Sequence, residues 1–226
     1  MTLALNEIYQ VARDAVTIFT AQGLSSCLCG GTGCALYGMK NRSPNDVDIV
    51  VMTYAHDTEE LKRILVLHSP RSFQLRPSRK RGATYKILYY TFHSYKSCKV
   101  DILIPGIMNI PDIPSRRIPI IDGLPAMTFM PLLLLKLQAW DDHRKSERID
   151  YRMKQHTDAR DIQELLKIAR ERHEHKRDAL WLPMSFLVAA EGRVASFISL
   201  FPSSGYVSKG DKKQISTAEL WQYIGF

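Results

Sequence analysis

The segment Asn45-Asp46-Val47-Asp48-Ile49-Val50-Val51 decides the fold prediction, because aspartates alternate with apolar residues at a period of two. Successive side chains of a β-strand point to opposite faces, so Asp46 and Asp48 would share one face while the residues between them enter a core. Such a pair is also common on the solvated face of an edge strand. Two carboxylates therefore predict a site only if further groups in the sequence accompany them.

A second stretch, Lys99-Val100-Asp101-Ile102-Leu103-Ile104, repeats the alternation and places Asp101 on the polar face of a later strand. Carboxylates that converge repel one another unless a cation lies between them. Oxygen ligands of this kind suit Mg²⁺ or Mn²⁺, and three aspartates on adjacent strands would hold two ions about 3.5–4 Å apart. The expected metal ligands are therefore Asp46, Asp48 and Asp101.

A glycine turn precedes the first aspartate strand. Residues 25–29 have the composition of a short strand and run into Gly30-Gly31-Thr32-Gly33, after which a helix is expected over residues 34–39. Backbone N–H groups in such a turn, together with the dipole of the following helix, bind phosphate groups. Most Gly-Gly turns are only tight connections, so this feature gains weight only from the aspartates that follow it.

The remaining periodicities predict an α/β (α+β) fold, with a mixed sheet flanked by helices and a helical C-terminal part. The sheet-containing core would span residues 1–125 and the helical region residues 126–226. Asp57 and Glu60 form a capping box at a helix start, and two strands joined by a short polar link predict a hairpin. Helices are expected over 3–22, 34–39, 57–67, 130–142, 157–172 and 184–200, and strands over 25–29, 46–52, 84–92, 98–104 and 118–121.

The composition is that of a globular protein, with 226 residues, 45% hydrophobic and 24% charged residues, and a formal charge of +8. The positive charge favours a polyanionic partner such as a nucleotide or nucleic acid. Four cysteines without a Cys-x-x-Cys pair favour buried thiols in a reducing compartment over a zinc site. We expect a cytoplasmic protein, because neither a signal peptide nor a segment long enough to span a membrane is evident.

A dinucleotide-binding turn is the nearest alternative for the glycines. Gly31-Thr32-Gly33 follows a strand and precedes an acidic residue, as in that motif. Leu36, however, stands where the third glycine is required, and a hairpin is expected where further βαβ units should follow.

Three pieces of sequence taken together resemble the nucleotidyltransferase superfamily typified by DNA polymerase beta. They are Cys29-Gly30-Gly31, then after a fourteen-residue interval Asp46-Val47-Asp48-Ile49, then Val100-Asp101-Ile102. The resemblance covers residues 24–104 and extends more weakly to about residue 170. Within the superfamily, the chain looks most like the small enzymes of the toxin and antitoxin type. Like them, it has Ile121-Asp122-Gly123-Leu124-Pro125 before a leucine-rich helix that bears Lys136, and Asp158-Ala159-Arg160-Asp161-Ile162 after it.

The resemblance implies transfer of a nucleoside monophosphate from an NTP, such as ATP, to an acceptor hydroxyl, with release of pyrophosphate. It implies that Asp46 and Asp48 bind both metal ions. Asp101 would bind the catalytic ion and help to deprotonate the acceptor. Gly30 and Gly31 would hold the β- and γ-phosphates.

Three further residues are candidates for nucleotide binding. Many members of the superfamily have serine where this chain has its second glycine, so a hydroxyl contact to phosphate comes from Thr32 or is absent. Arg42 lies just before the aspartates and would face the triphosphate. Lys136 sits on an apolar helix, where an ammonium group must meet an anion or reach solvent. It would contact a phosphate, snorkel to the surface, or pair with Asp158 or Asp161.

The acceptor stays open among a tRNA 3′ end or other RNA, a protein side chain and a small molecule. The basic stretch 71–81 is expected to be a loop, either solvated or in contact with phosphate or RNA. The competing hypothesis for function is a non-catalytic member of the same fold that binds a nucleotide or RNA without turnover.

Overall fold

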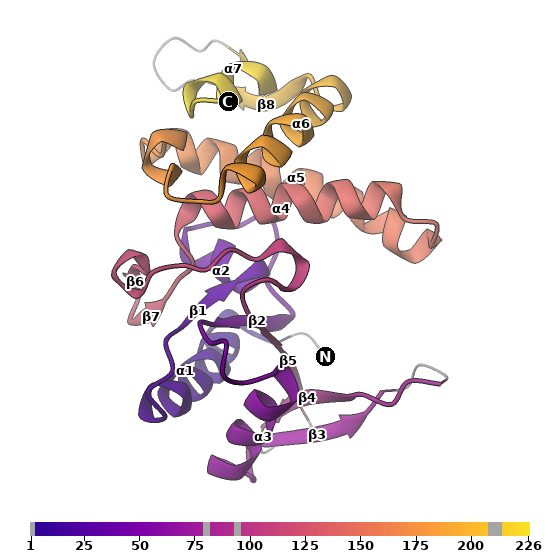
Figure 1. Cartoon of the computed structure of the whole chain (residues 1–226). Coiled ribbons are helices and arrows are strands. Elements are labelled where there is room, and N and C mark those ends of the chain that lie inside the picture. Colours follow the sequence, from indigo (N-terminus) through magenta and orange to yellow (C-terminus); the bar gives the residue numbers. More distant parts are fainter. Residues whose placement is uncertain (1–2, 79–81, 93–95, 208–213) are drawn as a thin grey trace. The chain divides into compact units, whose positions relative to one another are not determined.

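The computed structural model describes residues 3–78, 82–92, 96–207 and 214–226 (Figure 1). The chain forms two compact units. The first comprises Met1–Leu36 and Arg42–Thr128, and the second comprises Tyr37–Asn41 and Phe129–Phe226.

A five-stranded mixed sheet forms the centre of the first unit, as the sequence predicts. Its order is β1 (Ser26–Cys29), β2 (Asp46–Val51), β5 (Ser97–Leu103), β4 (Lys86–Thr91) and β3 (Phe73–Pro77). The β2–β5 pair is parallel, whereas the β1–β2, β5–β4 and β4–β3 pairs are antiparallel. The predicted hairpin is therefore present as β4 and β5, and the α/β fold class is confirmed.

Two helices, α1 (Leu5–Ala21) and α3 (Thr58–His68), pack against this sheet. The apolar side of α1 is buried because its hydrophobic residues recur every three or four positions. At the start of α3, the side chain of Asp57 accepts from the Glu60 N–H at 2.7 Å, and Glu60 accepts from the Asp57 N–H at 3.0 Å. The predicted capping box is thus present.

Two local predictions were wrong. The basic stretch 71–81 was expected to be a loop, but β3 occupies part of it, because Phe73 enters the core and pairs with Tyr90 of β4. Arg79, Lys80 and Arg81 of this stretch lie outside the described residues. Helix α2 (Gly30–Leu36) begins at the first glycine, because Gly30 has a φ of +55° and lets the chain pass directly from strand to helix.

The rest of the first unit consists of short elements that follow the sheet. They are η1 (Ile107–Asn109), η2 (Ser115–Arg117), β6 (Ile120–Ile121) and β7 (Leu124–Pro125). The strand expected near residues 118–121 corresponds to β6, which pairs with β7. The Met127 N–H donates to the Leu28 carbonyl at 2.8 Å, so the end of this segment is fixed to β1.

The second unit is mainly helical, as expected, and contains α4 (Phe129–Lys145), α5 (Ile149–Glu171), η3 (Lys176–Ala179), α6 (Met184–Leu200) and α7 (Thr217–Tyr223). Its core includes Trp140 and Phe197, whose rings meet edge-on with centroids 4.9 Å apart. A hairpin of β8 (Ser203–Val207) and β9 (Gln214–Ser216) was not predicted. Among the described residues, no helix combines the length and apolar character needed to cross a membrane.

Candidate functional site

Three aspartates converge where β2 and β5 run side by side. The parallel register sets Asp48 opposite Asp101 and Asp46 opposite Lys99. Asp46, Asp48 and Asp101 each offer a carboxylate oxygen, and these oxygens all lie within 4.8 Å of one another. The expectation that the three carboxylates share one side of adjacent strands is confirmed.

The strands hold these carboxylates firmly because their alternate residues are buried. Val47, Ile49 and Val100 have no exposed surface, which fixes the register and with it the face that the aspartates occupy. The charges of the aspartates also change the pKa of Cys98, a neighbouring residue in β5. Burial raises the pKa of the Cys98 thiol to about 12, and the negative charges of the three aspartates act in the same direction.

One cation stands among the carboxylates. The ammonium group of Lys99 lies on the same face of β5 as Asp101 and forms a short ion pair with it. Partial burial alone would lower the pKa of Lys99, but the hydrogen bond to Asp101 and the charges of the three aspartates together raise it. The cluster therefore carries its own positive charge, which sequence reasoning did not single out. The period-two spacing of Lys99 and Asp101 on one strand was the signal that predicts it.

The glycine turn lies against the aspartate strand. A β-carbon added at Gly30 would lie 1.8 Å from Asp48 Oδ2, so the backbone of Gly30 touches that carboxylate closely. A β-carbon added at Gly31 would lie 3.3 Å from Pro44 Cβ and 3.6 Å and 3.7 Å from the guanidinium nitrogens of Arg42. The structure thus brings Arg42 beside the second glycine of the turn.

Thr32 ties the turn to β2. Its side chain is fully buried, and the hydroxyl donates to the Asp46 carbonyl at 2.8 Å. The thiol of Cys29 makes a similar link and donates to the Asp48 carbonyl at 3.6 Å. These contacts hold the glycine turn and the two aspartates of β2 in one arrangement.

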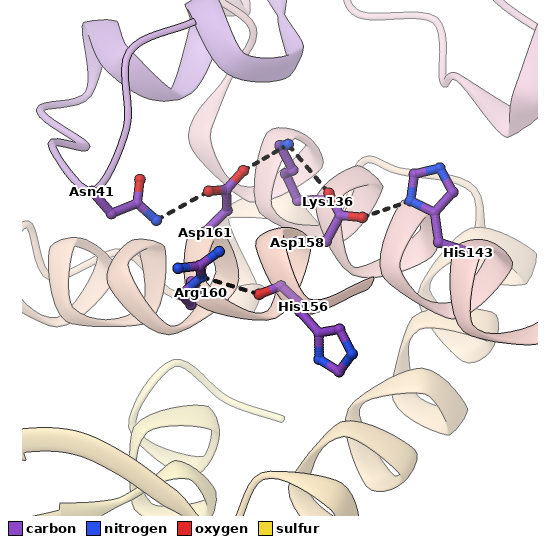
Figure 2. Close-up of polar contacts among 7 residues, drawn as sticks. All are labelled: Asn41, Lys136, His143, His156, Asp158, Arg160 and Asp161. Atoms are coloured by element: carbon purple, nitrogen blue, oxygen red, sulfur yellow. Dashed lines mark hydrogen bonds and ion pairs between the residues drawn. The ribbon is translucent and has the colours of Figure 1, made fainter. Parts of the chain in front are cut away.

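Lys136 belongs to the second unit and lies in a buried ionic cluster between α4 and α5 (Figure 2). Its ammonium nitrogen is 2.9 Å from Asp161 Oδ2 and 3.6 Å from Asp158 Oδ1. The pairing with Asp158 and Asp161 that was one alternative for this lysine is therefore present.

Other residues complete this cluster, and the sequence did not single them out. His143 Nδ1 lies 2.6 Å from Asp158 Oδ2, and the Asn41 amide donates to Asp161 Oδ1 at 3.0 Å. Figure 2 shows Asn41 and His143 at opposite ends, with Lys136 between the two aspartates. Asn41 is distant in sequence, so no local pattern indicated its contact with α5.

The donor set of the first unit suits a hard divalent cation. Three half-buried carboxylates within ligand distance of one another provide oxygen atoms, which Mg²⁺ and Mn²⁺ prefer, and leave room for water or phosphate oxygens. No nitrogen or sulfur ligand belongs to this group among the described residues. The residues present therefore fit the metal that the sequence predicts.

A scan against protein-family models found no match, and a search of the curated proteins found no relative. Solved structures do match. An antigenic nucleotidyltransferase-like protein from Paracoccidioides brasiliensis is 16% identical with a TM-score of 0.65, over 88% of this chain and 91% of that chain.

Two further structures are more distant in shape. ANT(2")-Ia in complex with adenylyl-2"-tobramycin is 10% identical with a TM-score of 0.45, over 86% of this chain and 98% of that chain. JHP933 from Helicobacter pylori is 16% identical with a TM-score of 0.43, over 86% and 77%. At 16% identity, the likeness to the Paracoccidioides protein concerns the fold alone. The chain has a nucleotidyltransferase-like fold, as the resemblance to the DNA polymerase beta superfamily predicted.

Proposed function

We propose that this protein is a metal-dependent nucleotidyltransferase that transfers a nucleoside monophosphate from an NTP to an acceptor hydroxyl and releases pyrophosphate. The observation that carries the proposal is the convergence of Asp46, Asp48 and Asp101 within 4.8 Å on two paired strands of a nucleotidyltransferase-like fold. Lys99 balances only one of the three negative charges, so the surplus of carboxylate favours bound cations.

Each aspartate has a role in this proposal. Asp46 and Asp48 would hold two Mg²⁺ or Mn²⁺ ions, and Asp101 would hold the ion on the acceptor side. Bound ions of this kind neutralise charge on the triphosphate and the attacking oxygen. Asp101 would accept the proton of the acceptor hydroxyl. The acceptor oxygen then bonds to the α-phosphorus, and the bond from the α-phosphorus to the leaving pyrophosphate breaks.

The glycine turn and Arg42 would bind the triphosphate. The first N–H groups of a helix have no partner within the helix, so those of Gly30, Gly31 and Thr32 are suited to phosphate oxygens. The Thr32 hydroxyl is already bonded to Asp46, so the contact from residue 32 would come from its backbone. The guanidinium group of Arg42 beside Gly31 supports its role with the triphosphate.

Lys136 would bind a phosphate group only by exchanging part of its pairing with Asp158 and Asp161. The surplus of carboxylate over ammonium in this cluster argues that the lysine is held in place by its partners. Its proposed role is therefore a phosphate contact made by an ammonium group that these two carboxylates keep in position. Transfer from the NTP is one question. The identity of the acceptor, the preferred NTP and any part in a toxin or antitoxin pair are separate questions with tests of their own.

The test is incubation of the protein with each α-³²P-labelled NTP, Mg²⁺ or Mn²⁺, and a cell extract, followed by RNase or protease treatment of the labelled product. We expect metal-dependent label transfer and pyrophosphate release that Asp46→Ala abolishes. Asp150→Ala is the matched control, because this aspartate is exposed and pairs only with Arg148 among the described residues. Nucleotide binding without turnover for any acceptor would instead support the non-catalytic alternative. The extract should be cytoplasmic, the compartment that the cysteine usage of the sequence favours.

A further inference from the structure

The positive charge of this protein is concentrated in one part of the chain. Residues 61–100 contain ten lysine and arginine residues and no aspartate or glutamate. The formal charge of this segment is therefore larger than the +8 of the whole protein. The remainder of the chain is therefore slightly acidic. The basic segment includes the end of α3, both strands β3 and β4, and the beginning of β5, so it lies in the same sheet as the carboxylate cluster.

The strand register places part of this segment on the face that carries the aspartates. Tyr89 of β4 is opposite Lys99 of β5, and Gln74 of β3 is opposite Tyr89. Side chains that are directly opposite in a sheet point to the same face. The face therefore continues without a break from Asp48 and Asp101 across β5 to β4 and the edge strand β3. Figure 1 shows β3 and β4 together at that side of the sheet.

An aromatic ring and a guanidinium group form the centre of this surface. Arg76 lies 4.8 Å above the centroid of the Tyr89 ring, and its Nη2 donates to Thr91 Oγ1 at 3.0 Å. Arg76 forms no ion pair within the part of the chain that the structure describes. The Tyr89 ring and the Thr91 hydroxyl therefore fix the position of the guanidinium group, and no carboxylate of the described residues neutralises its charge.

We propose that this surface, formed by Gln74, Arg76, Tyr89 and Thr91 and called here the β3–β4 platform, binds the single-stranded end of a nucleic acid that serves as the acceptor. The inference rests on the proposed function, because it assigns the acceptor class to the same carboxylate site. The positive charge of Arg76, which no carboxylate of the described residues pairs with, attracts a backbone phosphate. The flat Tyr89 ring and Arg76 guanidinium group provide the planes on which unpaired bases stack.

The alternatives fit the platform less well. A small-molecule acceptor needs a concave pocket that encloses it, whereas the platform is a sheet face at an edge. An acidic protein segment would be attracted by the charge but would gain little from the arrangement of Tyr89 beneath Arg76. Stacking on an aromatic ring is the interaction that separates a nucleic acid from other polyanions.

The test is the fluorescence anisotropy of labelled RNA and DNA oligonucleotides of the same sequence and about 15 nucleotides, a length that a single-strand binding surface spans. The full chain is titrated without NTP. Tyr89→Ala and Arg76→Ala should each weaken binding about tenfold, while Tyr89→Phe should bind as the wild type does because it keeps the ring. Comparison of the RNA and DNA arms shows which nucleic acid the platform prefers.

Lys96→Ala is the matched control. It removes one positive charge from the same basic segment, but its ammonium group pairs with Glu7 of α1 at 2.8 Å and is not part of the platform. It should change binding less than twofold. Heparin is the competitor without bases, and it should displace the nucleic acid from the wild type and from Tyr89→Phe only at a large excess of charge.

Equal binding by the wild type, Tyr89→Ala and Arg76→Ala, or no binding to either oligonucleotide, would overturn the inference. Equal competition by heparin at matched charge would do so as well, because it would show that bases contribute nothing. These results leave the proposed function intact if Asp46-dependent label transfer to another acceptor is observed. Binding that depends on the platform, without any metal-dependent transfer, would instead overturn the proposed function and leave the nucleic-acid surface standing.

Discussion

The backbone of Gly30 lies directly against the carboxylate of Asp48, so that a β-carbon at residue 30 would be 1.8 Å from Oδ2 and 2.7 Å from Cγ. Gly30→Ala must therefore displace Asp48 from the carboxylate cluster. We expect Mn²⁺ affinity to fall about 10–100-fold, the effect of disturbing a metal ligand through its support. Isothermal titration calorimetry with Mn²⁺ measures it.

Gly23→Ala is the control that distinguishes the effect of the Gly30–Asp48 contact from the effect of backbone strain. Gly23 has a φ of +72°, close to the +55° of Gly30, but a β-carbon there would meet no atom within 4 Å. An L residue at positive φ costs about 1 kcal/mol of stability in either variant. Gly23→Ala should thus lower the melting temperature and leave Mn²⁺ affinity unchanged. A similar loss of affinity in both variants would show that the Gly30–Asp48 contact is not the cause.

The ion pair between Lys99 and Asp101 predicts an unusual effect on metal binding. Lys99 supplies a positive charge inside the cluster that is to bind cations. Lys99→Met keeps the length of the side chain and removes the charge, so Mn²⁺ should bind about tenfold more tightly at low salt. Without metal, the same variant should be less stable than the wild type, because three carboxylates then repel one another with no cation among them.

Lys96→Met is the control for this prediction, since Lys96 lies in the same region of sequence but pairs with Glu7. Its Mn²⁺ affinity should equal that of the wild type. Weaker Mn²⁺ binding by Lys99→Met would mean that the ammonium group orients Asp101 for the metal and does not compete with it. Saturating Mn²⁺ should remove the difference in melting temperature between Lys99→Met and the wild type.

The sheet and the carboxylate cluster were predictable because they depend on local alternation. A period of two is enough to place Asp46 and Asp48 on the polar face of one strand and Asp101 on the polar face of another, and buried neighbours such as Val47 make those faces unambiguous. The parallel pairing of β2 with β5 then brings Asp48 opposite Asp101. The sequence alternation predicts which face each aspartate occupies, whereas the pairing itself comes from the fold.

Contacts between distant residues were not predictable by the same reasoning. The link from Asn41 to Asp161 joins two segments that share no periodic pattern. The edge strand β3 was missed because its composition, with arginine and proline beside Phe73, is typical of a loop. Its strand conformation depends on pairing with β4, which is a tertiary effect that overrides local preference.

Burial of Cys27 predicts a loss of stability at alkaline pH. Burial raises the pKa of this thiol from 9.0 to about 12. Above pH 9 the unfolded chain releases the thiol proton while the folded chain keeps it, so rising pH favours unfolding. The contribution amounts to about 1.4 kcal/mol per pH unit between pH 9 and 12.

Urea unfolding at pH 8, 9, 10 and 11 measures this dependence. Other groups also titrate in this range, so the comparison is between the wild type and Cys27→Ala. The variant should be less stable at pH 8, because a buried side chain is shortened, but its stability should fall less steeply above pH 9. Parallel curves for the two proteins would show that Cys27 does not contribute. Native Cys27 should also resist alkylation at pH 8.

The buried cluster around Lys136 predicts that Lys136→Met loses much stability and that a second substitution restores part of it. Lys136→Met leaves Asp158 and Asp161 buried without their shared ammonium partner. Removing one side of a buried ion pair costs about 3–5 kcal/mol, because the remaining charge is uncompensated. Urea unfolding of the second variant, Lys136→Met with Asp161→Asn, should recover part of that loss, since the amide removes the uncompensated charge.

The double variant also separates the structural role of Lys136 from its proposed role in nucleotide binding. Stability recovered by Asp161→Asn reflects the ionic cluster, while a phosphate contact cannot be restored without the ammonium group. We therefore expect NTP affinity to stay low in the double variant even as stability returns. Lys154→Met, an exposed lysine of α5, is the control and should alter neither quantity. Recovery of NTP affinity together with stability would instead mean that Lys136 acts only by holding Asp158 and Asp161, and that the nucleotide phosphates are bound by other residues.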